Sequence, residues 1–168
     1  IDIDGVLADL SAYSAVLVDM QTPPAQRWRE FFAHIPEATV LSIGRDLTWA
    51  LDGLGYTVVY STTRPSYAHA PTRSWLADRD FPVGRALLCR PASEFTEHTR
   101  QPWQIKLAHA RAVTNRHPAW LRSFVDDDPA ALAKLVSAGV PAVSAATLTG
   151  LTTTALRVAL NRQHDTDQ

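Results

Sequence analysis

The stretch Ile1-Asp2-Ile3-Asp4-Gly5-Val6-Leu7-Ala8-Asp9 opens the sequence and guides the interpretation of everything after it. Its first four residues have the form of a strand end, and the glycine that follows predicts a turn. Strands are usually five or six residues long, so we expect residues upstream of Ile1 and a first strand that is truncated here. Asp2 and Asp4 thus stand where a strand ends, and they are the first candidates for a chemical site.

Strand-like and helix-like segments alternate along the rest of the sequence. Short runs rich in apolar and β-branched residues predict strands, and amphipathic runs between them predict helices. The expected strands are 57–61, 86–89, 121–125 and 140–144, and the expected helices are 25–34, 43–54, 70–80, 103–113, 129–138 and 154–161. This alternation is typical of an α/β protein with a Rossmann-like, doubly wound parallel sheet. Ligands of such sheets bind at the carboxyl ends of the strands.

The composition fits one globular domain. The chain has 168 residues, of which 46% are hydrophobic and 20% charged, and its formal net charge is −1. Residues 1–168 are therefore expected to form a single domain with its own core. No apolar run is long enough for a membrane span. Cys89 is the only cysteine, which excludes an internal disulfide and favours a cytoplasmic location.

Acidic, basic and hydroxyl side chains stand near the expected strand ends. Asp126 and Asp127 follow one strand as Asp2 and Asp4 follow another, so the four carboxylates can converge. Crowded carboxylates repel each other, and a hard cation such as Mg²⁺ relieves that repulsion. A lysine and a hydroxyl opposite the metal suit a phosphoryl group. One aspartate can attack phosphorus, and a second carboxylate can transfer the proton.

Four segments resemble, in order, the motifs of the haloacid dehalogenase superfamily of phosphotransferases. The first has the DxDG(T/V) pattern, the second a threonine at a strand end, the third a helical lysine, and the fourth an acidic pair after an apolar strand. They are Asp2–Asp9, Thr62-Thr63-Arg64, Lys106 and Val125-Asp126-Asp127. The resemblance covers almost the whole chain and implies the Rossmann-like fold of that superfamily.

The resemblance also implies a role for each of these residues. Asp2 would be the nucleophile that forms an aspartyl-phosphate, and Asp4 would be the general acid and base. Thr62 and Lys106 would hold the phosphoryl group. The cofactor would be Mg²⁺, bound by Asp2, the backbone carbonyl of Asp4, Asp126 and Asp127. Asp4 argues against dehalogenation, because members that cleave carbon–halogen bonds lack this second aspartate.

Each motif has a simpler interpretation as well. An isolated DxDG can be a calcium loop or a plain turn, and Thr62 or Lys106 alone can be structural or solvated. Asp126–Asp128 before Pro129 can be an N-cap cluster, a role for which Asp128 is well placed. A receiver domain also combines Asp, Thr and Lys on a parallel sheet, but in a different chain order. One shared site accounts for all four segments together.

The segments between the motifs leave little room for a separate lid. Residues 10–40 supply a short helix around Trp28 and a linking loop, which predicts a small cap-like insert. Residues 65–105 supply one helix, one strand and a polar loop. A minimal cap or none leaves the site open to a bulky or polymeric substrate. A small-molecule phosphatase without a cap would exclude water poorly.

The middle of the chain gives an indication of the substrate. It resembles the 3′-phosphatase domain of phage-type polynucleotide kinase/phosphatases, which have one arginine after the short strand and another before the lysine of the third motif. The resemblance implies that Thr63, Arg64, Arg90 and Arg100 contact the substrate. Residues 61–125 have a net charge of +6, which suits a polyanion. The sequence has no Walker A motif, so a kinase domain would lie in another part of a longer chain.

Together these features predict a Mg²⁺-dependent phosphomonoesterase that acts on 3′-phosphate ends of nucleic acid or on nucleotides, without membrane contact. Two alternatives stay open: a phosphatase of small nucleotides or sugar phosphates, and a fold of this kind retained only for binding. Trp49, Trp75 and Trp103 fall on helices and are expected in the core. Cys89 is expected to be an inert buried thiol.

Overall fold

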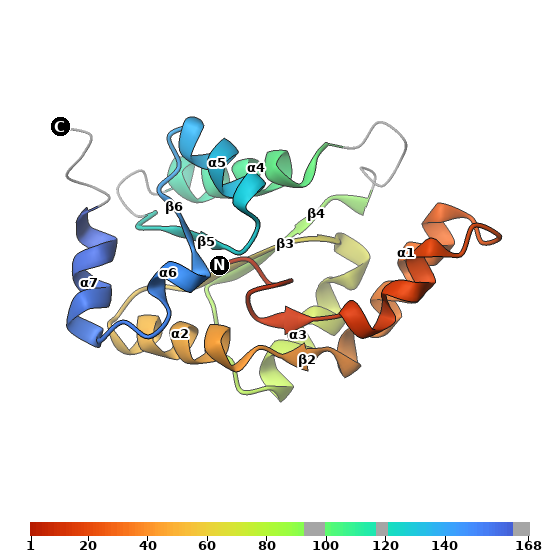
Figure 1. Ribbon diagram of the computed structural model, residues 1–168, viewed down its shortest axis with the longest axis horizontal. Helices are drawn as coiled ribbons and strands as arrows, with labels where there is room; N and C mark the ends of the chain where they lie inside the picture. The colour runs from red at the N-terminus through yellow and green to blue at the C-terminus, as the bar shows by residue number, and fades with distance from the viewer. Residues whose placement is uncertain (93–99, 117–120, 163–168) are drawn as a thin grey trace.

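The computed structural model describes residues 1–92, 100–116 and 121–162, which form a mixed α/β structure (Figure 1). Its strands are β1 (Ala8–Asp9), β2 (Thr39–Val40), β3 (Val59–Pro65), β4 (Ala86–Arg90), β5 (Phe124–Asp126) and β6 (Ala142–Ser144). Its α-helices are α1 (Pro24–Ala33), α2 (Ser42–Gly53), α3 (His69–Asp78), α4 (Pro102–Arg116), α5 (Pro129–Ser137), α6 (Ala145–Leu148) and α7 (Thr153–Arg162). Three 3₁₀ helices complete it: η1 (Ser11–Val18), η2 (Ile35–Glu37) and η3 (Ser66–Ala68). None of the helices within these ranges is long and apolar enough to cross a membrane.

Two parallel strand pairs flank the opening segment of the chain. β3 pairs in parallel with β4, and β5 pairs in parallel with β6. The opening segment lies between them: Ser61 N–H donates to the Ile1 carbonyl (2.8 Å), Ile3 N–H to the Ser61 carbonyl (3.1 Å), and Asp2 N–H to the Val125 carbonyl (2.8 Å). The α/β class and the parallel pairing expected from the sequence are confirmed.

The bounds of the strands differ from those expected. The strand expected at 57–61 is β3, which begins at Val59 because pairing with β4 begins there, opposite Ala86. β3 continues to Pro65 past an irregularity in its register, so Thr62 to Arg64 lie inside the strand rather than after it. Similarly, β5 begins at Phe124 and β6 at Ala142. Apolar composition indicates burial, whereas hydrogen bonding to a neighbour decides where a strand starts and ends.

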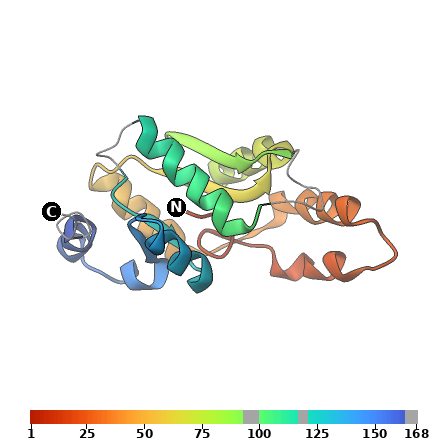
Figure 2. The same ribbon diagram turned by 90° about the horizontal axis from the view of Figure 1, so that it is seen from above.

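A short antiparallel pair was not predicted. Ala8 pairs with Val40 and Asp9 with Thr39, and two-residue strands are too short to show a periodicity. Between them the chain forms η1 and α1, which pack against each other and extend away from the main body (Figure 2). This arm lies within the segment expected to form a small cap-like insert.

Helices lie on both sides of the strands, with α4 and α5 on one side and α2 and α3 on the other (Figure 1). The core includes side chains that are at most 2% exposed, among them Ile3, Leu7, Trp75, Val125 and Leu156. The prediction for Trp75 is confirmed and that for Trp49 is wrong, because Trp49 is 43% exposed. Its indole Nε1–H donates to the Asp80 carbonyl at 2.8 Å, which satisfies the ring nitrogen at the surface. Trp103 is only half-buried.

Helix α2 packs closely on the turn that follows Asp4. A methyl group added at Gly44 would lie 1.8 Å from the Val6 carbonyl oxygen and 3.0 Å from the Leu7 side chain. The Val6 carbonyl oxygen belongs to the backbone, so it cannot move aside for a methyl group as the end of a flexible side chain can. Gly44 thus allows α2 to pack on this turn.

We therefore expect Gly44→Ala to lower the free energy of unfolding by about 1–3 kcal/mol, the usual cost of overpacking. Gly53→Ala is the matched control, because it lies in the same helix and a methyl group there would meet nothing within 4 Å. That control should be neutral or stabilising by up to ~1 kcal/mol. Urea denaturation of both variants measures the difference, and equal stabilities would contradict the close packing.

Candidate active site

Asp2 is held on both sides by backbone hydrogen bonds, between β3 and β5. Its N–H donates to Val125, and its two neighbours in the chain bond to Ser61. The residue is 4% exposed, so its carboxylate is almost fully removed from water. A carboxylate in such a position needs charged or hydrogen-bonding partners.

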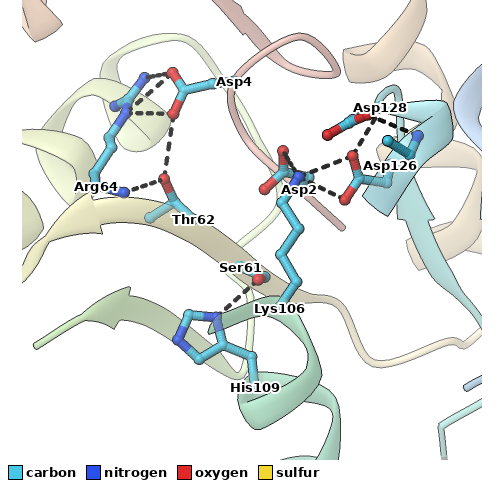
Figure 3. Close-up of polar contacts among 10 residues, drawn as sticks. Asp2, Asp4, Ser61, Thr62, Arg64, Lys106, His109, Asp126 and Asp128 are labelled. Atoms are coloured by element: carbon cyan, nitrogen blue, oxygen red, sulfur yellow. Dashed lines mark hydrogen bonds and ion pairs between the residues drawn. The ribbon is translucent and has the colours of Figure 1, made fainter. Parts of the chain in front are cut away.

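Lys106 supplies the cationic partner from α4. Its Nζ lies 3.1 Å from Asp2 Oδ2, and 2.9 Å and 2.7 Å from Asp126 Oδ1 and Oδ2 (Figure 3). Lys106 is 5% exposed and Asp126 is fully buried. Residues from the opening segment, α4 and β5 therefore meet around one ammonium group, as the sequence predicted for a common site.

The three consecutive aspartates that begin at the last residue of β5 occupy different environments. Asp126 Oδ1 accepts a hydrogen bond from Asp128 N–H at 3.0 Å. Asp128 is the N-cap of α5, and its Oδ1 accepts from Ala130 N–H at 2.8 Å, as the simpler interpretation proposed for that residue. Asp127 is exposed, and it offers a carboxylate oxygen within 4.8 Å of oxygens from Asp2 and Asp126. This acidic trio, Asp2, Asp126 and Asp127, faces one point.

Gly5 allows Asp127 to reach that point. Its backbone has φ +83°, a conformation that other residues rarely adopt. A methyl group at this position would lie 2.1 Å from Asp127 Oδ2. The glycine of the opening stretch is thus required both by its turn and by the carboxylate packed against it.

The acidic trio has the donor set of a Mg²⁺ site. Carboxylate oxygens are the ligands that this cation prefers. Burial raises the pKa of Asp2 to about 8, with Lys106 opposing the shift and Asp126 adding to it. Burial and the charge of Asp126 also raise the pKa of Asp127. For Lys106, burial lowers the pKa, but the attraction of Asp2 and Asp126 outweighs it and the pKa is raised. When all three carboxylates are deprotonated, the one ammonium group leaves a charge of −2, which a divalent cation would balance.

Asp4 points away from the acidic trio, toward β3. Arg64 Nε lies 3.2 Å and 3.1 Å from its two carboxylate oxygens, and Arg64 Nη2 lies 2.7 Å from Asp4 Oδ1. Thr62 Oγ1 donates to Asp4 Oδ2 at 3.3 Å and accepts from Arg64 N–H at 3.1 Å (Figure 3). The Asp4 side chain is 39% exposed, so it is anchored on one side and open on the other. Its expected contribution to metal binding, the backbone carbonyl, stays a prediction.

The four residues expected to bind substrate are in two places. Arg64 is fully buried, and its Nη1 donates to Thr72 at 3.1 Å. In this structure Arg64 forms an ion pair with Asp4. Its contact with substrate stays a prediction. Thr63 is half-buried beside it on β3. Arg90, at the end of β4, donates from Nη2 to the carbonyl of Arg100, which brings the two remaining arginines together.

Sequence reasoning missed one polar residue next to the site, His109. His109, 8% exposed, lies one turn after Lys106 on α4. Its Nδ1 is 2.9 Å from Ser61 Oγ on β3, and its Nε2 is 3.3 Å from the Cys89 carbonyl oxygen on β4. The helical spacing of His109 from Lys106 was the available signal. Cys89 is half-buried rather than buried as expected, and burial raises the pKa of its thiol to about 11, so it stays protonated at neutral pH.

Comparisons with known proteins give no match: no protein-family model, curated protein or solved structure is significantly similar to this chain. The geometry of the site therefore carries the functional argument.

A divalent cation should stabilise the protein more at high pH than at low pH. Metal ligands bind in their deprotonated form, so protons compete for carboxylates whose pKa is raised. The pKa of Asp2 is about 8 in the folded state, against an ordinary value of 3.8 for an aspartate side chain, so the folded state binds more protons between these limits. Without the cation, stability should fall as the pH rises through this window. Millimolar Mg²⁺ should offset that loss by binding the folded state only.

Thermal unfolding at pH 6 and pH 8, with and without Mg²⁺, measures this linkage. The increase in melting temperature should be larger at pH 8, and Asp127→Asn should reduce it. Asp78→Asn changes an exposed carboxylate on α3 and should leave it unaltered. A stabilisation of equal size at both pH values, or one that Asp127→Asn does not reduce, would contradict a cation among these carboxylates.

Proposed function

We propose that this chain is a Mg²⁺-dependent phosphomonoesterase of the haloacid dehalogenase type, with a Rossmann-like doubly wound sheet and a minimal cap. The observation that carries the proposal is the meeting of Asp2, Lys106, Asp126 and Asp127, which come from three separate segments in the family's order. The succession of β4, β3, the opening segment, β5 and β6, linked by parallel pairing and backbone hydrogen bonds, supports the fold assignment.

The buried carboxylate of Asp2 is the proposed nucleophile. One of its oxygens attacks phosphorus, and the bond from phosphorus to the leaving oxygen breaks, which gives an aspartyl-phosphate. Bound Mg²⁺ would supply positive charge opposite the phosphoryl oxygens, and Asp2, Asp126 and Asp127 would hold it. Lys106 Nζ, already 3.1 Å from Asp2 Oδ2, stabilises the charge that spreads over those oxygens.

Asp4 is the proposed proton carrier. It donates its proton to the leaving alkoxide, and it then takes a proton from the water that attacks the aspartyl-phosphate, so that Asp2 and inorganic phosphate are released. Arg64 and Thr62 donate hydrogen bonds to its carboxylate and fix its orientation. This supports the role, because a proton carrier must be held in a fixed orientation. Its 39% exposed side chain is accessible to a leaving group and to water.

The preferred substrate is a 3′-phosphate end of nucleic acid or a nucleotide. The positive charge of residues 61–125 supports a polyanion, and the Arg90 side chain at the end of β4 bonds to the backbone carbonyl of Arg100. Guanidinium groups are well suited to phosphates, since they can donate two parallel hydrogen bonds.

Asp2→Asn tests the proposed nucleophile. The amide keeps the size of the side chain but cannot attack phosphorus, so kcat for a generic aryl phosphate should fall by about a thousandfold or more. Circular dichroism should show that the variant is folded. The control Asp78→Asn should keep kcat within about twofold of the parent, since exposed surface changes have small effects. EDTA should stop turnover and excess Mg²⁺ should restore it. An active Asp2→Asn variant would refute the mechanism.

Values of kcat/KM for a 3′-phosphorylated oligonucleotide and for free mononucleotides test the substrate. We expect the oligonucleotide to be preferred by about tenfold or more at low salt, with the preference shrinking as salt is added. Equal values would favour the small-molecule phosphatase instead. Lack of phosphate release from a broad panel with Mg²⁺ would favour a binding role.

A further inference from the structure

A buried histidine links the helix that carries Lys106 to the two strands beside it. His109 projects from α4 and is 8% exposed, while Ser61 on β3 is 2% exposed. Both side chains lie next to the site and neither has a role in the proposed reaction (Figure 3). Buried polar groups of this kind are retained at a cost unless they are hydrogen-bonded.

The hydrogen bonds determine the tautomer of the neutral imidazole. The Cys89 carbonyl, 3.3 Å from Nε2, can only accept, so Nε2 carries the hydrogen. In the neutral ring, Nδ1 then accepts from the Ser61 hydroxyl at 2.9 Å. The ring thus joins α4 to β3 at one nitrogen and to β4 at the other.

Ser61 is also the residue whose backbone holds the opening segment at Asp2. Its N–H donates to Ile1 and its carbonyl accepts from Ile3, on either side of Asp2. Lys106 lies three residues before His109, on the same side of α4. A displacement of α4 along β3 would therefore move the Lys106 ammonium relative to the Asp2 carboxylate.

We propose that His109, through its hydrogen bond to Ser61, is a positioning residue that sets where Lys106 meets Asp2. The bond fixes the position of α4 along β3. Because Lys106 lies one turn earlier on the same helix, the bond also fixes the position of Lys106. The consequence for catalysis rests on the proposed phosphatase function, but the consequence for Lys106 does not.

Acetylation of the two lysines tests the position of Lys106 without any assay of activity. Lys106 is buried and Lys134 is exposed, so mass spectrometry after limited acetic anhydride treatment gives their labelling ratio with an internal reference. Ser61→Ala should raise the Lys106 to Lys134 ratio by about threefold or more. Tyr60→Phe is the matched control: it removes another buried β3 hydrogen bond, the 2.6 Å bond from Tyr60 to the Pro82 carbonyl, and should leave the ratio unchanged.

Rescue separates positioning from general destabilisation. His109→Asn keeps an acceptor near the position of Nδ1 and should keep the low labelling ratio, whereas His109→Leu should raise it like Ser61→Ala. If His109→Leu does not fold, Ser61→Ala alone decides, because it removes only one oxygen atom. With an aryl phosphate, Ser61→Ala should lower kcat about tenfold to a hundredfold while Tyr60→Phe stays within about twofold.

An unchanged labelling ratio in Ser61→Ala, or an equal rise in Tyr60→Phe, would overturn the proposal. If the parent protein hydrolyses no phosphomonoester, the proposed function fails, and the labelling ratios still decide the role of His109.

Discussion

The sharing of one buried ammonium by two buried carboxylates is the constraint on which this structure depends. Lys106 lies within 3.1 Å of Asp2 and 2.7 Å of Asp126, and all three side chains are at most 6% exposed. Removing one partner from such an arrangement leaves an uncompensated buried charge, which typically costs ~3–5 kcal/mol. The opening segment, α4 and β5 must therefore keep their relative positions.

The surrounding structure contains features that maintain those positions. Glycines allow close approach on one side: Gly44 lets α2 pack on the turn after Asp4, and Gly5 lets that turn meet Asp127. On the other side, buried polar side chains join elements. Arg64 connects β3 to Asp4 and to α3, and His109 connects α4 to β3 and β4. Packing and polar contacts thus fix the same site from different directions.

Much of the site could be predicted from the sequence, because its residues stand at positions that the strand pattern makes visible. The strand pattern predicted that Asp2 and Asp126 converge, and the resemblance of the four segments to a phosphotransferase superfamily implied that Lys106 joins them. The periodicity of the sequence could not predict which hydrogen-bond or ion-pair partner each side chain has. Arg64 was expected to face the substrate, and its contact with Asp4 depends on a continuation of β3 that composition does not reveal.

The remaining differences have similar causes. β1 and β2 have two residues each, and their pairing joins positions that are 30 and 32 residues apart, so no local pattern marks them. Trp49 is on a helix, where a large aromatic side chain usually faces the core, yet the Asp80 carbonyl gives its indole a partner at the surface. His109 is one of six histidines, and its spacing from Lys106 gives no sign of the partners that the fold places opposite its ring, Ser61 and Cys89.

The run Asp126-Asp127-Asp128 shows how much depends on alignment rather than on composition. Three identical residues perform three jobs: one is neutralised by a lysine, one joins the open face of the acidic trio, and one starts a helix. A single residue inserted into β5 would leave the run of three aspartates intact in the sequence. It would, however, shift each aspartate by one position, into the environment that its neighbour has now. In this segment the chain therefore tolerates changes in length less than its repeated letters suggest.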